Sequence, residues 1–135
     1  YFAYTGNTTY GVQNLEYDPY SNQWFMAVYK GKKKTFPNYQ IYAIDNSVKP
    51  TTKTLVGYGG ERGKVVELSK AGLHDEATGV CGWNFDYGNM GMQALGDGYF
   101  YFFHFDKTNK EKNSGWLELY QYKPETQKPF VKVGR

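Results

Sequence analysis

Two short stretches place a histidine beside a carboxylate, a combination that can carry out chemistry. LHDEATGV contains His74 and Asp75, and FFHFDKTNK contains His104 and Asp106. An imidazole next to a carboxylate can transfer protons or hold a metal ion. Because side chains alternate along a strand, His104 and Asp106 are expected to share one face and reach a common ligand. These four residues are the candidate catalytic residues of the chain.

Each of the four also has a structural explanation. LHDEATGV aligns with EYDPYSNQW as strand, Asp, two residues, Ser or Thr, Gly or Asn, and strand again. Asp75 is therefore expected to form a turn as Asp18 does, while ordinary packing and strand-end capping account for His104 and Asp106. The sequence contains no Ser-His-Asp order, zincin helix, recognisable carboxylate pair or cofactor motif. We expect no metal or cofactor, and whether the chain is an enzyme stays open.

A second group of candidate residues recurs in two parts of the chain. FAYTGNTTYGVQNL, residues 2–15, aligns with FDYGNMGMQAL, residues 85–95, with short gaps. Amide side chains both donate and accept hydrogen bonds, which suits the hydroxyls of a sugar. The alternative is that they bond neighbouring backbone and hold one repeat against the next. The recurring candidate ligand-binding residues are Tyr4 and Tyr87, Asn7 and Asn89, and Gln13 and Gln93.

Two further residues are candidate ligand contacts. Trp83 precedes the second copy of the motif, where it would either stack on a sugar ring or fill a core. Arg62 lies in GYGGERG, residues 57–63, whose glycines suggest phosphate binding. This stretch lacks the Lys-Ser/Thr of a P-loop, the dinucleotide-binding spacing and a following helix. A flexible loop with Arg62 as a rim contact is therefore preferred.

Composition indicates one folded domain. The chain has 135 residues, 19% of them aromatic and 21% charged, with 14 tyrosines, which is not a disordered composition. Much of the net charge of +3 comes from the lysines of YKGKKKTF. This cluster is predicted to be a loop, so no nucleic-acid partner is expected. The single cysteine, Cys81, excludes an internal disulfide and is predicted to be buried. No apolar run of about 18 residues is present, so no membrane insertion is expected.

Two features of the first residues bear on the cellular context of the chain. The sequence opens on YFAYTGN, without an initiator methionine or polar lead-in, and we expect a piece excised from a longer protein. Asn7-Thr8-Thr9 has the form of a glycosylation sequon. An extracellular or periplasmic location is slightly favoured, and the compartment otherwise stays open.

Strand patterns dominate the chain, and no stretch has a convincing helical period. Turn residues such as Asp, Pro, Gly and Asn separate the short apolar segments. We therefore predict an all-β chain folded as an antiparallel meander. The predicted strands are VQNLEY, QWFMAVY, YQIYAI, TKTLVGY, KVVEL, YFYFFHF, WLELYQY and FVKV.

The repeat extends over about residues 2–58 and 85–133, each with an aromatic strand, a lysine-rich loop and a second strand. This order resembles the blades of a β-propeller, with YDPYSNQWF similar to the turn between the first two strands of many blades. Residues 11–58 would form one blade, residues 91–133 another, and KVVELSKAGL to VCGWNF part of a third. The resemblance names no specific family.

The resemblance implies that the first strand of each blade lines a channel, where Gln13 and Gln93 would face a ligand. A complete propeller has at least four blades, so two to three would leave strand edges unpaired. Three arrangements would cover these edges. In order of preference, the chain is a fragment of a larger propeller, it closes a ring with other copies of itself, or it is a small sandwich or barrel. The preferred function is a ligand-binding module for carbohydrate or another polar ligand. The alternatives are part of a propeller hydrolase acting on glycans or phosphoesters, and a protein-interaction scaffold.

Overall fold

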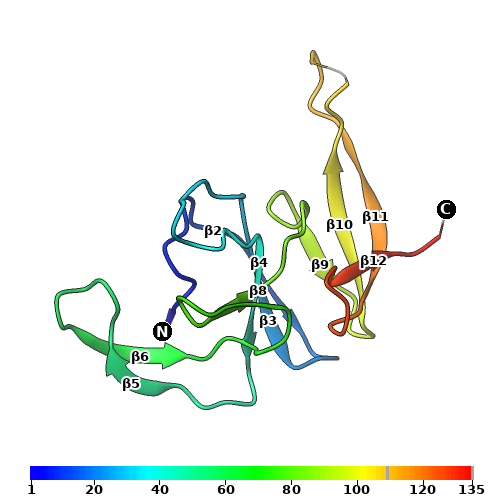
Figure 1. Cartoon of the computed structure of the whole chain (residues 1–135). Coiled ribbons are helices and arrows are strands. Elements are labelled where there is room, and N and C mark those ends of the chain that lie inside the picture. Colours follow the sequence, from blue (N-terminus) through cyan, green and yellow to red (C-terminus); the bar gives the residue numbers. More distant parts are fainter. Residues whose placement is uncertain (109, 135) are drawn as a thin grey trace.

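The computed structural model describes residues 1–108 and 110–134, which contain twelve strands and no helix (Figure 1). The prediction of an all-β chain is therefore confirmed. The strands form four small sheets and, among the described residues, do not close into a barrel. Their bounds are β1 Phe2–Ala3, β2 Val12–Asp18, β3 Gln23–Val28, β4 Ile41–Asp45, β5 Thr51–Thr54, β6 Arg62–Val66, β7 Leu73–Asp75, β8 Val80–Gly82, β9 Met92–Ala94, β10 Tyr99–Phe105, β11 Gly115–Tyr122 and β12 Phe130–Lys132.

Strands β2, β3 and β4 form an antiparallel sheet in sequence order. The turn between β2 and β3 is held by Asp18, whose carboxylate accepts hydrogen bonds from the Tyr20 and Ser21 amides and from the Ser21 hydroxyl. The fourth strand expected here, TKTLVGY, is wrong: β5 pairs with β6 instead. The free edge of β4 is bridged by Leu68 and Trp83. All four residues of β5 are exposed, so they could not bury a face against this sheet.

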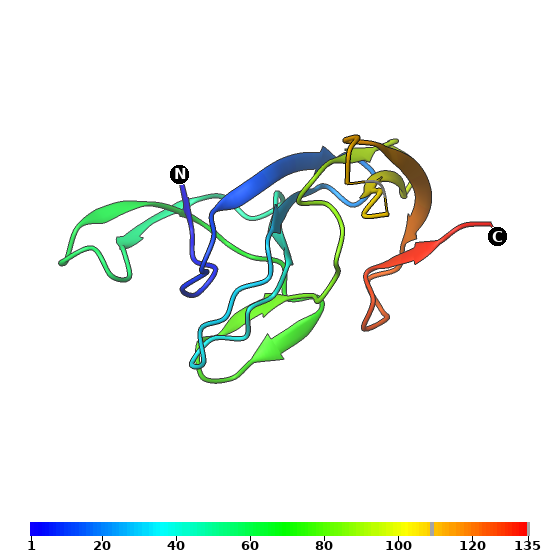
Figure 2. The same cartoon turned by 90° about the horizontal axis from the view of Figure 1, so that it is seen from above.

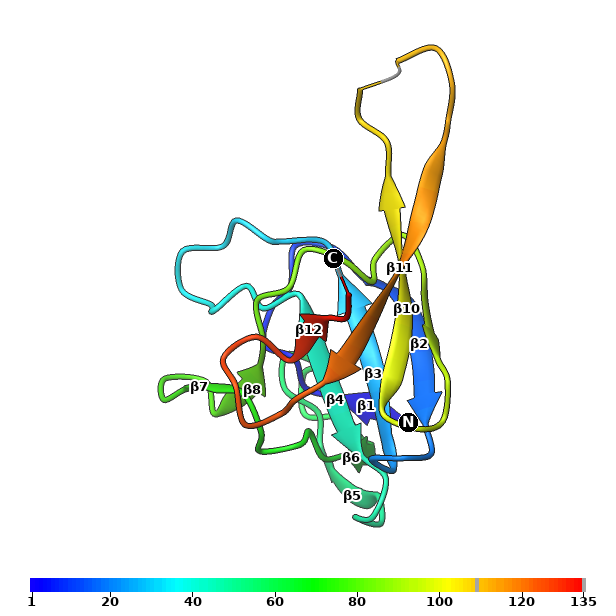
Figure 3. The ribbon, with the colours of Figure 1, turned by 90° about the vertical axis from the view of Figure 1, so that its right-hand side faces the viewer.

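Strands β9 to β12 form a four-stranded antiparallel sheet in sequence order, as predicted for residues 91–133. The β10–β11 hairpin is the longest, and its tip projects beyond the rest of the molecule (Figure 3). Its alternating side chains divide into two faces. Phe100 and Phe102 of β10 share the inner face with Tyr120 and Tyr122 of β11.

The remaining strands form two small sheets. β1 pairs with β6 in parallel, and β6 pairs with β5 in antiparallel order, so the molecule is not an antiparallel meander throughout. β7 and β8 form a hairpin in the segment expected to belong to a third blade. The N- and C-termini lie on opposite sides of the molecule (Figure 1 and Figure 2).

The core lies between the two larger sheets and is largely aromatic. Phe25 of β3 is fully buried, and its ring centroid lies 5.4 Å from that of Phe100, 5.1 Å from Tyr122 and 5.5 Å from Phe130. Edge-to-face contacts of this kind add to the stabilisation from burial. A second cluster covers part of the opposite face of the β2–β4 sheet, where Tyr42 packs with the β7–β8 hairpin. The β2–β4 sheet is therefore the central layer.

One face of the β9–β12 sheet is uncovered. We call it the outer face. The pairing register places its residues on the side opposite Phe100 and Phe102. Leu117 is 62% exposed and Tyr101 39% exposed, which is unusual for neighbouring apolar residues on one sheet. The outer face comprises Tyr101, Phe103, Phe105, Leu117, Leu119 and Val131.

Candidate functional site

A cleft with polar and aromatic walls lies where the β3–β4 loop meets the segment leading into β9. It has two adjoining parts of about 520 Å³ and about 780 Å³. Both parts are lined by Lys30, Gln40, Asp86 and Tyr87. We call it the inter-sheet cleft. Its volumes fall within the range of small-molecule sites.

Four lysines from four separate segments line the inter-sheet cleft. Lys30 comes from the β3–β4 loop, Lys107 from the β10–β11 connection, Lys128 from the β11–β12 turn and Lys132 from β12. The carboxylate among the lining residues is that of Asp86, whose Oδ1 accepts a hydrogen bond of 3.1 Å from Gln40 Nε2. The walls of the cleft therefore carry an excess of positive charge.

Tyrosine rings form much of the remaining wall. Tyr10, Tyr29, Tyr87 and Tyr120 line one part of the cleft or the other. The Tyr87 ring is stacked on the buried His104 imidazole, with centroids 3.8 Å apart and planes inclined by 29°. The ring also contacts Phe85 and is 36% exposed, so it is held in place by its neighbours and partly meets solvent.

A hydrogen-bonded network centred on Glu118 adjoins the cleft. Glu118 Oε1 accepts from Lys132 Nζ at 2.8 Å and from Trp116 Nε1 at 2.9 Å. Its Oε2 lies 3.3 Å from both His104 Nε2 and the Tyr120 hydroxyl. The Tyr120 hydroxyl is also 3.1 Å from His104 Nε2. The network thus fixes one cleft lysine and one cleft tyrosine.

The pKa values of this network set its charge state. The hydrogen bond from Lys132, followed by that from Trp116, lowers the pKa of Glu118 to about 2. Burial raises the pKa of Tyr120, and the Glu118 charge raises it further. Burial lowers the pKa of His104, although the Glu118 charge partly opposes this. At neutral pH Glu118 is therefore ionised, while Tyr120 and His104 are neutral.

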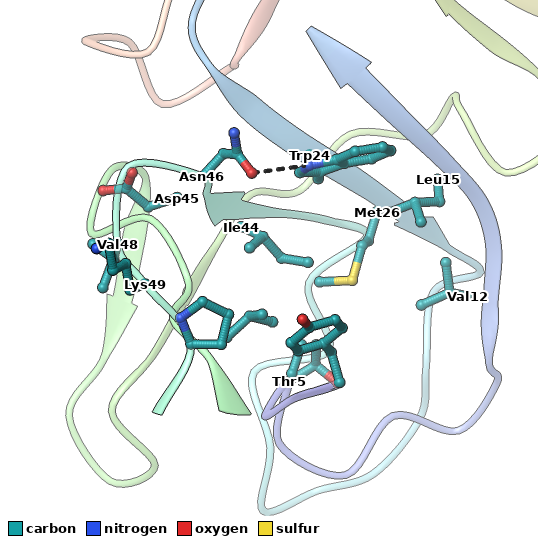
Figure 4. A pocket seen from close by; sticks show the side chains of 14 residues that line it. Thr5, Val12, Leu15, Trp24, Met26, Ile44, Asp45, Asn46, Val48 and Lys49 are labelled. Carbon is teal, nitrogen blue, oxygen red and sulfur yellow. Dashed lines mark hydrogen bonds between the residues drawn. The ribbon is translucent and has the colours of Figure 1, made fainter. Parts of the chain in front are cut away.

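A second pocket, of about 720 Å³, lies on the opposite side of the β2–β4 sheet (Figure 4). Met26 and Ile44 point into it, and Val12 and Leu15 of β2 line one side. Two of its polar residues already have partners, since Asn46 Oδ1 accepts from Trp24 Nε1 at 3.3 Å and Asp45 accepts from Ser47. Most of the other lining residues are apolar, whereas the inter-sheet cleft brings several polar side chains together, so the inter-sheet cleft is the stronger candidate.

No family model, curated protein or solved structure matches this chain. In the described part of the chain, no three His, Cys, Asp or Glu side chains are grouped so that they could hold a metal ion. The same residues include no helix long and apolar enough to cross a membrane.

The four candidate catalytic residues do not form one site. Asp75 caps its turn by accepting from the Thr78 amide at 3.0 Å and from the Thr78 hydroxyl, as the alignment with Asp18 predicts. Asp106 directly follows β10 and accepts from Thr108 in the next turn, as the strand-end capping alternative predicts. His74 is exposed on β7, in a different sheet from His104.

The repeated amides serve mainly as structural contacts. Gln93 Nε2 donates to Glu16 Oε1 at 2.9 Å, and the same oxygen accepts from the Ala94 amide at 2.8 Å. This joins β2 to β9 across the two larger sheets. Gln13 Nε2 donates to the nearby Gly11 carbonyl oxygen. Gln13 therefore bonds neighbouring backbone, and Gln93 helps to hold one sheet against the other, as the structural alternative to ligand binding predicts.

The other predicted ligand contacts are divided between the cleft and the rest of the molecule. Tyr87 and Asn89 line the inter-sheet cleft. Trp83 is fully buried in the core, so its expected stacking on a sugar is wrong because no face of the ring is free. The other three residues are not among those that line the cleft. Asn7 accepts a hydrogen bond from Lys33, and Tyr4 is partly exposed. Arg62 is the first residue of β6, and its guanidinium donates to the Thr52 carbonyl oxygen at 3.4 Å.

Sequence reasoning missed Glu118 and the convergence of the lysines. In WLELYQY, Glu118 alternates with leucines, and such a position ordinarily indicates a solvent-facing side chain. The feature that would have identified Glu118 is its position in the β10–β11 pairing. Glu118 lies opposite Phe102 and therefore shares the inner face of the sheet with His104. That register depends on the length of the β10–β11 hairpin. The convergence of Lys30, Lys107 and Lys128 depends on tertiary structure alone.

Proposed function

We propose that this chain is a ligand-binding module and that the inter-sheet cleft binds a carbohydrate or another polar ligand. The observation that carries the proposal is the Tyr87 ring, which is stacked on His104, is partly exposed and lines both parts of the cleft. A fixed, half-exposed aromatic ring offers a flat apolar face to a sugar ring. Its rigidity reduces the entropy lost on binding.

Polar groups around Tyr87 supply the remaining requirements for such a ligand. Gln40 is largely buried and is held by Asp86, while Asn84 and Asn89 line the walls. Amides and carboxylates of this kind satisfy sugar hydroxyls, which both donate and accept hydrogen bonds. The cleft therefore combines an apolar platform with oriented hydrogen-bonding groups.

Binding is better supported than hydrolysis. The Glu118 carboxylate is ionised and makes polar contacts with four side chains. The Tyr120 hydroxyl keeps its proton far above neutral pH. Neither is a group poised near neutral pH, which general acid-base catalysis favours. The network instead has the properties of a support that holds Lys132 and Tyr120 in place.

The proposal is tested by substituting Tyr87 with alanine and measuring binding on a glycan array and by calorimetry. We expect the affinity for a bound glycan to fall by about tenfold or more, which corresponds to roughly 1.4 kcal/mol. Tyr101→Ala is the matched control, because Tyr101 is 39% exposed and lies on the outer face. An array without binding, or an equal loss in both variants, would contradict the proposal. Thermal melting of both variants separates loss of binding from unfolding.

A second candidate function is suggested by the outer face. Four of its six apolar residues, Tyr101, Phe105, Leu117 and Val131, are exposed. The inner face of the same sheet packs against the β2–β4 sheet. We propose that the outer face packs against a second copy of the chain. This would make the chain part of a larger β assembly, as the resemblance to propeller blades implies.

A further inference from the structure

We propose that the ligand of the inter-sheet cleft is an acidic saccharide, a sugar chain that carries carboxylate or sulfate groups. This inference rests on the proposed function and specifies the ligand class. The lysines that line the cleft come from three regions that are far apart in sequence, namely Lys30, Lys107, and Lys128 with Lys132. Their convergence is therefore a property of the fold and is not explained by the local lysine run of residues 30–34.

Three of these lysines form no ion pair with a carboxylate in the part of the chain that the structure describes. The ion pairs found there join Lys53 to Glu67, and His104 and Lys132 to Glu118. Lys30, Lys107 and Lys128 take part in none of them. A concave surface with one sign of charge concentrates ligands of the opposite sign.

The cations of the cleft favour an anionic group on the ligand without fixing the geometry of that group. No arginine lines the cleft among the described residues, so the planar, two-point recognition that arginine gives to carboxylate and phosphate is missing. Lysine acts as a point charge that tolerates several positions of the anion. The tyrosine walls then stack on the sugar rings between the charged groups.

Asp86 suggests how such a ligand is arranged. It lies in both parts of the cleft, where it holds the Gln40 amide. An acidic group of the ligand would be repelled there, whereas a hydroxyl would find an acceptor. Lys128 and Lys132 line one part of the cleft and Lys107 lines the other. We therefore infer a ligand of at least two sugars, with a hydroxyl near Asp86 and an acidic group in each part.

The test uses matched acidic and neutral sugars with the whole chain. Oligogalacturonate, a hyaluronan oligosaccharide and a heparin-derived oligosaccharide are compared by calorimetry with carboxyl-reduced oligogalacturonate and with chitohexaose. We expect at least one acidic ligand to bind at least tenfold more tightly than the neutral ones, with affinity falling as salt rises. Equal binding of neutral and acidic sugars would overturn the inference while leaving the proposed function intact. Absence of binding to either class would overturn both.

Paired variants locate the charges. Lys107→Gln combined with Lys128→Gln is expected to weaken binding of the acidic ligand by about tenfold. The control, Lys49→Gln combined with Lys64→Gln, removes the same charge from exposed positions outside the cleft and is expected to retain binding. An equal loss in both pairs would overturn the inference, because it would indicate non-specific attraction. Tighter binding of single-stranded RNA than of any acidic sugar would overturn it in favour of a nucleic-acid ligand.

Discussion

Glu118 is a carboxylate whose ionisation the fold strongly favours. Its side chain is 17% exposed and contacts Lys132, Trp116, His104 and Tyr120. A carboxylate with so many donors costs little to ionise, which is why its pKa falls to about 2. The negative charge of Glu118 strengthens its hydrogen bonds to these neighbours and so holds them in position.

Glu118→Gln is expected to lower the free energy of unfolding by about 1–3 kcal/mol at pH 7, because a charged acceptor is lost. The folded pKa lies below the ordinary value of about 4.5, so the stabilisation is present above pH 4.5 and is lost as the pH falls towards 2. The difference between wild type and variant should therefore shrink between pH 5 and pH 2. Urea unfolding at these pH values measures it.

Glu67→Gln provides the control, because Glu67 pairs with Lys53 at the surface. It should change stability by less than about 1 kcal/mol. A second measurement is the imidazole titration of His104 by NMR. Its pKa should lie below the ordinary value and should fall further in Glu118→Gln, because the Glu118 charge favours the protonated ring. A difference in stability that stays constant down to pH 2 would refute this account of Glu118.

At the scale of single residues, sequence identified His104 and Tyr87 as candidates but did not identify the residues that contact His104. Period-two alternation pointed to Asp106, whereas the observed partners are across the hairpin on β11. Alternation reports which residues share a face of one strand. It cannot report which residues lie opposite on the next strand, since that depends on the hairpin register.

The elements were more predictable than the contacts between them. YFYFFHF coincides with β10, and VQNLEY and WLELYQY each lie within an observed strand, β2 and β11. These segments combine β-branched and aromatic residues with clear turn signals at their ends. TKTLVGY does not join the β2–β4 sheet, because its three strand residues, Thr52 to Thr54, are exposed and pair with β6. Strand propensity indicates a strand but not its partner.

The turn between β2 and β3 provides a test at this scale. Asp18 is fully buried and accepts three hydrogen bonds within the turn. Asp18→Ala leaves two amides without an acceptor and should lower the free energy of unfolding by about 2–4 kcal/mol. Asp97→Ala, in an exposed turn where Asp97 accepts from the Tyr99 amide, should cost less than about 1 kcal/mol. Equal losses in denaturant unfolding would show that burial of the cap is unimportant.

On the scale of the whole molecule, the two larger sheets pack through aromatic rings and are joined by Glu16 and Asn14. Composition indicated one aromatic-rich folded domain, and the four-strand order of residues 91–133 was predicted. The inter-sheet cleft could not be predicted, because its walls come from loops whose positions depend on how the two sheets pack. The parallel pairing of β1 with β6 was also beyond local patterns.

The outer face supplies the prediction at this scale. We expect native mass spectrometry to detect an oligomer of the wild-type chain and a monomer of Leu117→Glu, because a buried charge would oppose packing of this face. Val56→Glu is the matched control, since Val56 is 64% exposed but belongs to the β5–β6 connection. A monomeric wild type, or dissociation of both variants alike, would argue against the second candidate function.

The strand order of the two sheets at the ends of the chain has a consequence for folding. Every pairing in the β9–β12 sheet joins consecutive strands, so each requires closure of a short loop. In the N-terminal sheet, by contrast, Phe2 of β1 pairs with Val65 of β6, which is distant in sequence. Loop closure is slower and costs more entropy when the partners are distant in sequence. The C-terminal sheet should therefore form early and the N-terminal strand should join last. In hydrogen exchange, the amides of Phe100 and Phe102 should be protected long after those of Phe2 and Ala3 have exchanged.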